Sequence, residues 1–138
     1  MRRPVVLLAD DHRPSREAYR AILEEEFQIV REVADGKALV EAYRESHPDV
    51  VVSDVAMSGL SGIAATEAIL REHPAARIVL VTARADRAMM RRALAVGALG
   101  YVLKTRMGED LLPAVRAALR YDVLISPMPT IVGRSRDE

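Results

Sequence analysis

Val50–Ser53 (VVVS) is a short apolar run that ends directly in a carboxylate, Asp54, and this stretch decides the fold class. A continuous apolar run of this length is typical of a strand buried on both faces, as in parallel sheets. Three further runs also lead into chemically active side chains: Val5–Ala9 before Asp10 and Asp11, Val79–Val81 before Thr82, and Gly100–Leu103 before Lys104. Because the carboxyl ends of parallel strands meet at one edge of a sheet, we expect these side chains to gather there.

Short strand-like runs alternate with longer segments of helical period along most of the chain. The expected strands are Val5–Ala9, the more polar edge strand Gln28–Val33, Val50–Ser53, Arg77–Val81 and Gly100–Leu103. Helices are expected from Pro14 or Ser15, from Asp35-Gly36 to before Pro48, from Ser61 or Gly62 to Glu72, and from Asp86 to Gly97. A last helix, with Glu109 and Asp110 near its N-terminus and Pro113 in its first turn, is expected to run to about Tyr121. Strict alternation of five βα units predicts an α/β fold, a parallel sheet covered by helices on both faces.

The domain organisation follows from where this alternation stops. The pattern predicts one domain over residues 1–121. Beyond it, Pro127-Met128-Pro129 and the polar residues 133–138 predict a linker or tail over residues 122–138.

The overall composition limits the class of protein. The 138 residues carry 20 basic and 20 acidic side chains, so no net positive field would hold nucleic acid. There is no Cys, which excludes disulfides and thiolate metal sites and fits a reducing compartment. No stretch approaches the roughly 18 apolar residues of a membrane span, and the first apolar run is too short for a signal peptide. These features favour a cytoplasmic protein without a membrane partner.

Asp10, Asp11 and Asp54 are the candidate metal ligands. Neighbouring carboxylates raise each other's pKa, so a cation would stabilise their charged forms. Magnesium prefers such hard oxygen ligands. The Asp10-Asp11 pair taken alone is explained equally well as the start of the loop before the first helix. Together with Asp54 and Lys104 at the same sheet edge, the pair predicts a Mg²⁺ cofactor.

Asp54 is the candidate nucleophile, because a carboxylate can accept a phosphoryl group as an acyl phosphate. Such transfer depends mostly on positioning and charge neutralisation. Lys104 would supply a second cation and Thr82 a hydroxyl hydrogen bond. Taken singly, Lys104 and Thr82 read as ordinary strand-end residues; their joint occurrence favours a phosphoryl site.

At these residues the chain resembles the receiver domain of two-component response regulators, over roughly residues 5–121. The stretches that carry the resemblance are Leu8–His12 (LADDH), Val52–Met57 (VSDVAM), Leu80–Ala83 (LVTA) and Gly97–Lys104 (GALGYVLK). The resemblance implies a flavodoxin-like, doubly wound fold with strand order 2-1-3-4-5. It also implies a sensor histidine kinase as partner and no separate turnover substrate.

The resemblance implies a role for each matched residue. Asp54 would be the phosphoacceptor. Asp11 would bind Mg²⁺ directly, Asp10 largely through water, and Ala56 through its backbone carbonyl. Thr82 and Tyr101 would form the switch pair, and Lys104 would sense the phosphate.

Details are most similar to the NarL/FixJ type, whose receivers precede a helix-turn-helix output domain that is not part of this chain. This type implies transcription regulation, with DNA contacted only through the output domain, and a homodimer is a further expectation. Ser58 and Thr105 depart from the family pattern, which usually has proline at the first position and in many receivers at the second.

Several alternatives follow from the same residues. A flavodoxin-like cofactor binder would need a Gly-, Ser- or Thr-rich phosphate loop after the first strand. A magnesium phosphohydrolase would need a general acid beside Asp54, and Val55 and Ala56 offer none. A pseudo-receiver acting only as an interaction module would not need the acid, Thr and Lys set. A stand-alone receiver acting through protein–protein contacts is the alternative closest to the main interpretation.

Overall fold

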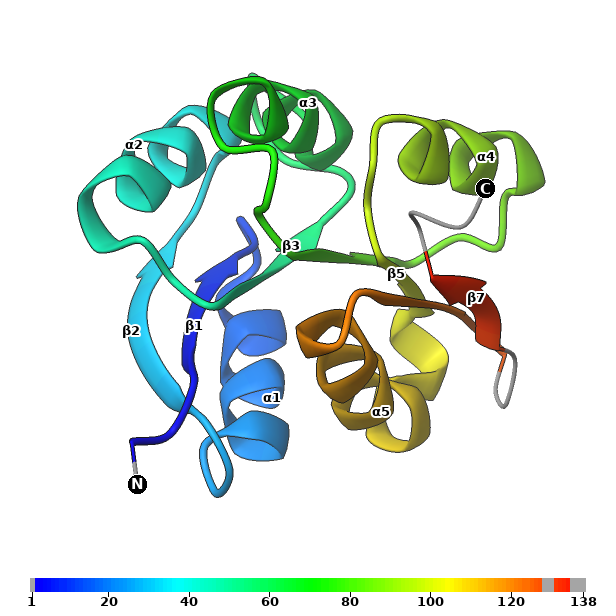
Figure 1. The fold of residues 1–138 in the computed structure, drawn as a ribbon, viewed down its shortest axis with the longest axis horizontal. Coiled ribbons are helices and arrows are strands. Elements are labelled where there is room, and N and C mark those ends of the chain that lie inside the picture. Colours follow the sequence, from blue (N-terminus) through cyan, green and yellow to red (C-terminus); the bar gives the residue numbers. More distant parts are fainter. Residues whose placement is uncertain (1, 128–130, 135–138) are drawn as a thin grey trace.

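The computed structural model describes residues 2–127 and 131–134, which form one seven-stranded sheet between two helical layers (Figure 1). The strands, in the order β2-β1-β3-β4-β5-β6-β7, are β1 (Val5–Ala9), β2 (Gln28–Val33), β3 (Val50–Asp54), β4 (Ile78–Thr82), β5 (Gly100–Leu103), β6 (Asp122–Ile125) and β7 (Ile131–Arg134). The helices are α1 (Arg13–Leu23), α2 (Gly36–Ser46), α3 (Gly62–Glu72), α4 (Arg87–Ala95) and α5 (Met107–Leu119), with a 3-10 turn, η1 (Lys104–Arg106), before α5. The first five strands are parallel, and their predicted order and edge strand are confirmed.

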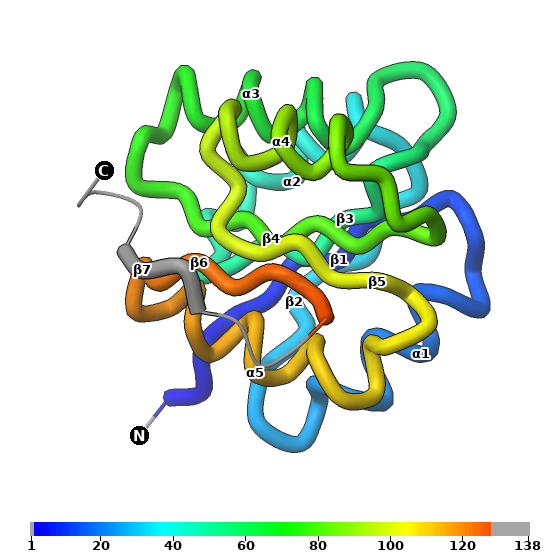
Figure 2. The backbone as a smooth tube through the Cα atoms, turned by 90° about the vertical axis from the view of Figure 1, so that its right-hand side faces the viewer, coloured from blue at the N-terminus to red at the C-terminus, as the bar shows by residue number. Residues whose placement is uncertain are grey.

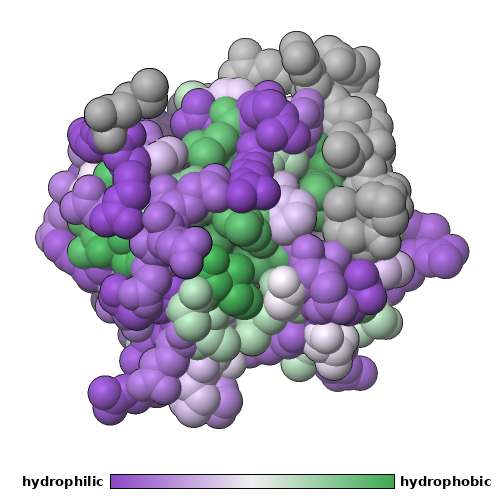
Figure 3. Space-filling model, turned by 90° about the horizontal axis from the view of Figure 1, so that it is seen from below, coloured by the Kyte–Doolittle hydropathy of each residue, from purple (hydrophilic) through white to green (hydrophobic). Residues whose placement is uncertain are grey.

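Helices α1 and α5 cover one face of the sheet and α2, α3 and α4 the other (Figures 1 and 2). Successive side chains of a strand point to opposite faces. Accordingly, Val6 and Leu8 pack in the α1–α5 core, whereas Leu7 and Ala9 pack in the α2–α4 core. Seen from the side of α1 and α5, hydrophobic surface lies between hydrophilic margins (Figure 3). Because alternate side chains enter the two cores, the almost purely aliphatic strands are buried on both faces, as their continuous apolar runs predict.

Polar side chains begin three of the helices near the predicted positions. Asp35, Ser61 and Asp86 each accept a hydrogen bond from the backbone N–H three residues ahead. These N-caps satisfy donors that the first helical turn leaves unpaired. Asp86 thus lies just before α4 instead of inside its first turn.

The C-terminal region differs from the sequence expectation of five strands. β6 pairs in parallel with β5, and β7 pairs antiparallel with β6. Part of the predicted linker or tail, residues 128–130 and 135–138, lies outside the described residues. A four-residue strand followed by Pro127 gives little periodic signal, which explains why β6 was missed.

The expected place of Pro113, in the first turn of the last helix, was wrong. α5 begins at Met107, directly after η1, so Pro113 lies in the helix interior instead of the first turn. Glu109 and Asp110 occupy the first turn of α5, as their charge predicts. Tertiary packing of the helix outweighs the lost hydrogen bond at proline.

Two glycines shape the loop that follows Asp54. Gly59 has a left-handed φ of 71°. At Gly62, a Cβ would lie 2.0 Å from the carbonyl oxygen of Asp54, so α3 starts directly against the end of β3. Gly62 therefore serves a close backbone approach, whereas Gly59 serves the turn.

Candidate functional site

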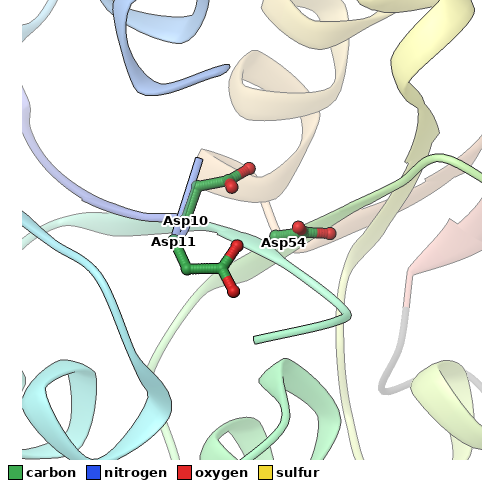
Figure 4. A group of neighbouring side chains, drawn as sticks. All are labelled: Asp10, Asp11 and Asp54. Carbon is green, nitrogen blue, oxygen red and sulfur yellow. The ribbon is translucent and has the colours of Figure 1, made fainter. Parts of the chain in front are cut away.

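The strand ends meet at one edge of the sheet, as the sequence predicts. Ala9 pairs with Ser53, Asp54 with Val81, and Thr82 with Leu103. This register brings the carboxyl ends of β1, β3, β4 and β5 to the same level. The side chains of Asp10, Asp11 and Asp54 lie together there (Figure 4).

The three carboxylates can surround one cation. One oxygen from each of Asp10, Asp11 and Asp54 lies within 4.8 Å of the others. Asp10 is fully buried and Asp54 is buried, whereas Asp11 is exposed. Hard oxygen ligands with one side open to solvent fit a cation such as Mg²⁺, which keeps several of its waters.

The Lys104 ammonium lies between two of these carboxylates. Its Nζ is 3.0 Å from Asp10 Oδ2 and 3.2 Å from Asp54 Oδ2. It also donates to Ser15 Oγ at 3.3 Å. One cation thus partly compensates two buried anions.

The pKa values of Asp54 and Lys104 are both raised, which disfavours the charged form of Asp54 and favours that of Lys104. Burial raises the pKa of Asp54, Asp10 raises it further, and Lys104 and the Ala56 N–H offset this only in part. Burial lowers the pKa of Lys104, but Asp10 and Asp54 outweigh this effect, so its pKa lies above the ordinary value. At neutral pH, Lys104 is a fixed cation beside a carboxylate whose charge is costly.

Asp11 and the loop after Asp54 form the open side of the site. Ser58 Oγ donates to Asp11 Oδ2 at 3.4 Å, and Ala56 N–H donates to Asp54 Oδ1 at 3.3 Å. Ser58 therefore places a hydroxyl beside Asp11 where the family usually has proline. The carbonyl of Ala56 as a metal ligand stays a prediction.

Thr82 and Tyr101 are close to the site but not bonded to Asp54 in the described residues. The Thr82 hydroxyl donates to the carbonyl of Arg84 at 3.2 Å and accepts from its N–H at 3.1 Å. The Tyr101 hydroxyl is buried without a hydrogen-bond partner of normal geometry in the described part of the chain. Burial raises the pKa of Tyr101, and the nearby Thr82 side chain offsets this in part.

Three residues of α1 and the loop before it were not anticipated at the site. Tyr19 donates a hydrogen bond from its hydroxyl to Asp10 Oδ2 at 2.6 Å, and the backbone N–H of His12 donates to Asp10 Oδ1 at 2.8 Å. His12 Nδ1 also lies 2.8 Å from Ser15 Oγ. The sequence signal was a tyrosine on the apolar stripe of α1, because a buried phenol needs a hydrogen-bond partner.

Comparison with known proteins identifies the family. The chain matches the response regulator receiver domain over residues 6–116 and belongs to that family. The receiver domain of the response regulator NarL from Mycobacterium tuberculosis superimposes with a TM-score of 0.81 and 28% identity, covering 87% of this chain and 98% of that one. The match favours the receiver interpretation over the flavin-binding and hydrolase alternatives.

The chain is also similar in sequence to curated regulatory proteins. The oxygen regulatory protein NreC of Staphylococcus carnosus is 34% identical over 91% of this chain and 59% of its own length. The chemotaxis protein CheY of Halobacterium salinarum is 37% identical over 83% of this chain and 95% of its own length. The chain spans little more than half the length of relatives such as NreC and is similar to NarL- and LuxR-type regulators in their receiver region. Among the described residues, none of the helices is both long and apolar enough to cross a membrane.

Replacing Asp54 with Asn is expected to stabilise the metal-free protein at neutral pH. A raised carboxyl pKa means that the parent loses stability as pH rises from the ordinary Asp value, about 3.9, through the folded value. The variant lacks this loss, so its gain in the free energy of unfolding over the parent should be largest near pH 7 and should shrink toward pH 4. Thermal unfolding in chelator measures it; about 1 kcal/mol moves the Tm of such a domain by roughly 4 °C.

The matched control is Glu67→Gln, an exposed acid on α3. It should leave the Tm nearly unchanged at every pH. A Tm of Asp54→Asn at or below that of the parent at pH 7 would contradict the assigned electrostatics.

Proposed function

We propose that this receiver domain accepts a phosphoryl group on Asp54 from a sensor histidine kinase, in a reaction that needs Mg²⁺. The observation that carries the proposal is the Lys104 ammonium, held within 3.2 Å of both Asp10 and Asp54 at the edge where three carboxylates meet. This arrangement combines a nucleophilic carboxylate, a fixed cation and a set of hard oxygen ligands.

The chemistry follows from this chain's own residues. An Asp54 oxygen forms a bond to phosphorus while the bond between phosphorus and the kinase histidine nitrogen breaks, and that nitrogen keeps the electron pair. The raised pKa of Asp54 reflects an incompletely compensated, and therefore reactive, carboxylate. Lys104 pairs with a phosphoryl oxygen. Asp10, Asp11, Asp54 and the Ala56 carbonyl would hold Mg²⁺, which supplies charge neutralisation at the phosphoryl group.

Thr82 and Tyr101 form the proposed switch pair. A phosphoryl group on Asp54 is a new acceptor for the Thr82 hydroxyl, which otherwise bonds to the backbone of Arg84. When the Thr82 hydroxyl bonds to the phosphoryl group instead of to Arg84, the segment leading into α4 is released. Tyr101, whose ring lines a pocket of about 510 Å³ together with residues of α4, can then change its rotamer. The bistable element is the loop and helix from residue 83 to 97.

The output of the whole protein is also a proposal. Relatives of NarL and LuxR type support a receiver that regulates transcription through a DNA-binding domain outside this chain. We place it in the cytoplasm, with residues 1–121 as the receiver and 122–138 as a linker or tail of which β6 and β7 form part. It has no separate turnover substrate, and a homodimer stays a prediction.

A second candidate is a receiver that acts through protein–protein contacts without an output domain. The observation that favours it is the match to the CheY of Halobacterium salinarum, of which this chain covers 95%.

Incubation with acetyl phosphate and Mg²⁺ is expected to add one phosphoryl group, measured as intact mass. Asp54→Asn should abolish the addition, and so should removal of divalent cations with chelator. Lys104→Ala should slow it by at least about tenfold, because a charge-assisted contact at the reacting oxygens is lost.

Replacement of the exposed Glu67 by Gln is the control and should leave phosphorylation unchanged. Addition that persists in Asp54→Asn, or that proceeds equally well without metal, would show that another group reacts.

Amide hydrogen exchange with beryllofluoride, a phosphoryl mimic, tests the switch. The parent should show altered exchange over residues 83–103, and Thr82→Ala should lose most of this change while Asp54 still reacts, because a ligand shifts an equilibrium only by its differential contacts. An equally strong response in Thr82→Ala would place the coupling elsewhere.

A further inference from the structure

Tyr19 is a buried phenol directly behind the phosphoryl site. It lies on α1, is fully buried in the α1–α5 core, and donates its hydroxyl to Asp10 Oδ2 at 2.6 Å. The same oxygen lies 3.0 Å from Lys104 Nζ. Burial, reinforced by the bond to Asp10, raises the pKa of Tyr19, so the phenol is a neutral donor.

The orientation of Asp10 depends on protein donors. The carboxylate is fully buried and is contacted by three protein donors. Tyr19 and Lys104 contact Oδ2, and the His12 N–H donates to Oδ1 at 2.8 Å. Of these donors, Lys104 is also shared with Asp54, and the backbone N–H belongs to a loop. Tyr19 is the donor held in a packed core, so its hydroxyl fixes the orientation of the Asp10 carboxylate.

Ser15 adds a second polar contact from the same helix. It lies one helical turn before Tyr19, on the same side of α1, and is buried. Its Oγ is 3.3 Å from Lys104 Nζ and 2.8 Å from His12 Nδ1. The polar pair on an otherwise apolar face of α1 thus reaches both Asp10 and Lys104.

We propose that Tyr19 is a positioning residue for the phosphoryl site: its hydroxyl fixes the Asp10 carboxylate and, through Asp10, the Lys104 ammonium before the cation and phosphoryl group arrive. This inference rests on the proposed function. It adds a residue of α1 to a site that the strand ends alone would otherwise define.

The test compares Tyr19→Phe with Tyr43→Phe. Phenylalanine keeps the ring in the core and removes only the hydroxyl. Tyr43 is a buried tyrosine of the α2–α4 core that makes none of the site's hydrogen bonds, so it is the matched control. Amide shifts of residues 54–57 report the dissociation constant for Mg²⁺, and intact mass reports the rate of phosphorylation by acetyl phosphate at saturating Mg²⁺.

Loss of a hydrogen bond to a ligating carboxylate is expected to raise the Mg²⁺ Kd of Tyr19→Phe by about tenfold and to slow phosphorylation at saturating Mg²⁺ by a similar factor. Tyr43→Phe should match the parent in both. In metal-free protein, the side-chain carboxyl carbon of Asp10 should shift in Tyr19→Phe only. A merely structural role would lower the Tm without moving any of these readouts.

Parent-like Mg²⁺ affinity and an unmoved Asp10 carboxyl shift in Tyr19→Phe would overturn the inference, as would equal changes in Tyr43→Phe. If the parent itself were not phosphorylated, the proposed function would fail, and the metal affinity and the Asp10 shift would still decide the role of Tyr19.

Discussion

One lysine ammonium shared by two buried carboxylates is the interaction on which this site depends. Asp10 and Asp54 lie close together and are both buried, so two uncompensated negative charges would be costly there. Lys104 contacts both, yet the pKa of Asp54 remains raised, so the compensation is incomplete. The remaining negative charge makes the site attractive to a divalent cation, and under the proposed function Lys104 would then be shared with an incoming phosphoryl group.

The rest of the structure holds these groups at contact distance. Parallel pairing of β3 with β1 and β4 brings Asp54 level with the ends of both neighbours. Gly62 lets α3 start directly on the end of β3, which sets the loop on the open side of the site. α1 contributes Tyr19 from the core behind Asp10. Asp54 is therefore linked by pairing to both neighbouring strands and, through Lys104 and Asp10, to α1.

Most of the fold and the reactive set could be predicted from the sequence because both depend on local pattern. Continuous apolar runs mark doubly buried strands, and their last residues must meet at one edge. What could not be predicted depends on tertiary packing. The bond from Tyr19 to Asp10 joins a helix to a strand end, and β6 gains its partner only because the edge of β5 is free to pair. Pro113 was misplaced because packing of α5 outweighs its local preference. The roles of all the site residues remain predictions, since they concern a phosphorylated, metal-bound state.

The most direct test of incomplete charge compensation is the titration of the Asp54 carboxyl carbon, followed by NMR in metal-free protein and in Lys104→Met. We expect a midpoint above the ordinary value of about 3.9 in the parent and a still higher one in the variant, because the compensating cation is gone. A parent midpoint at or below the ordinary value, or one that Lys104→Met leaves unchanged, would contradict this account.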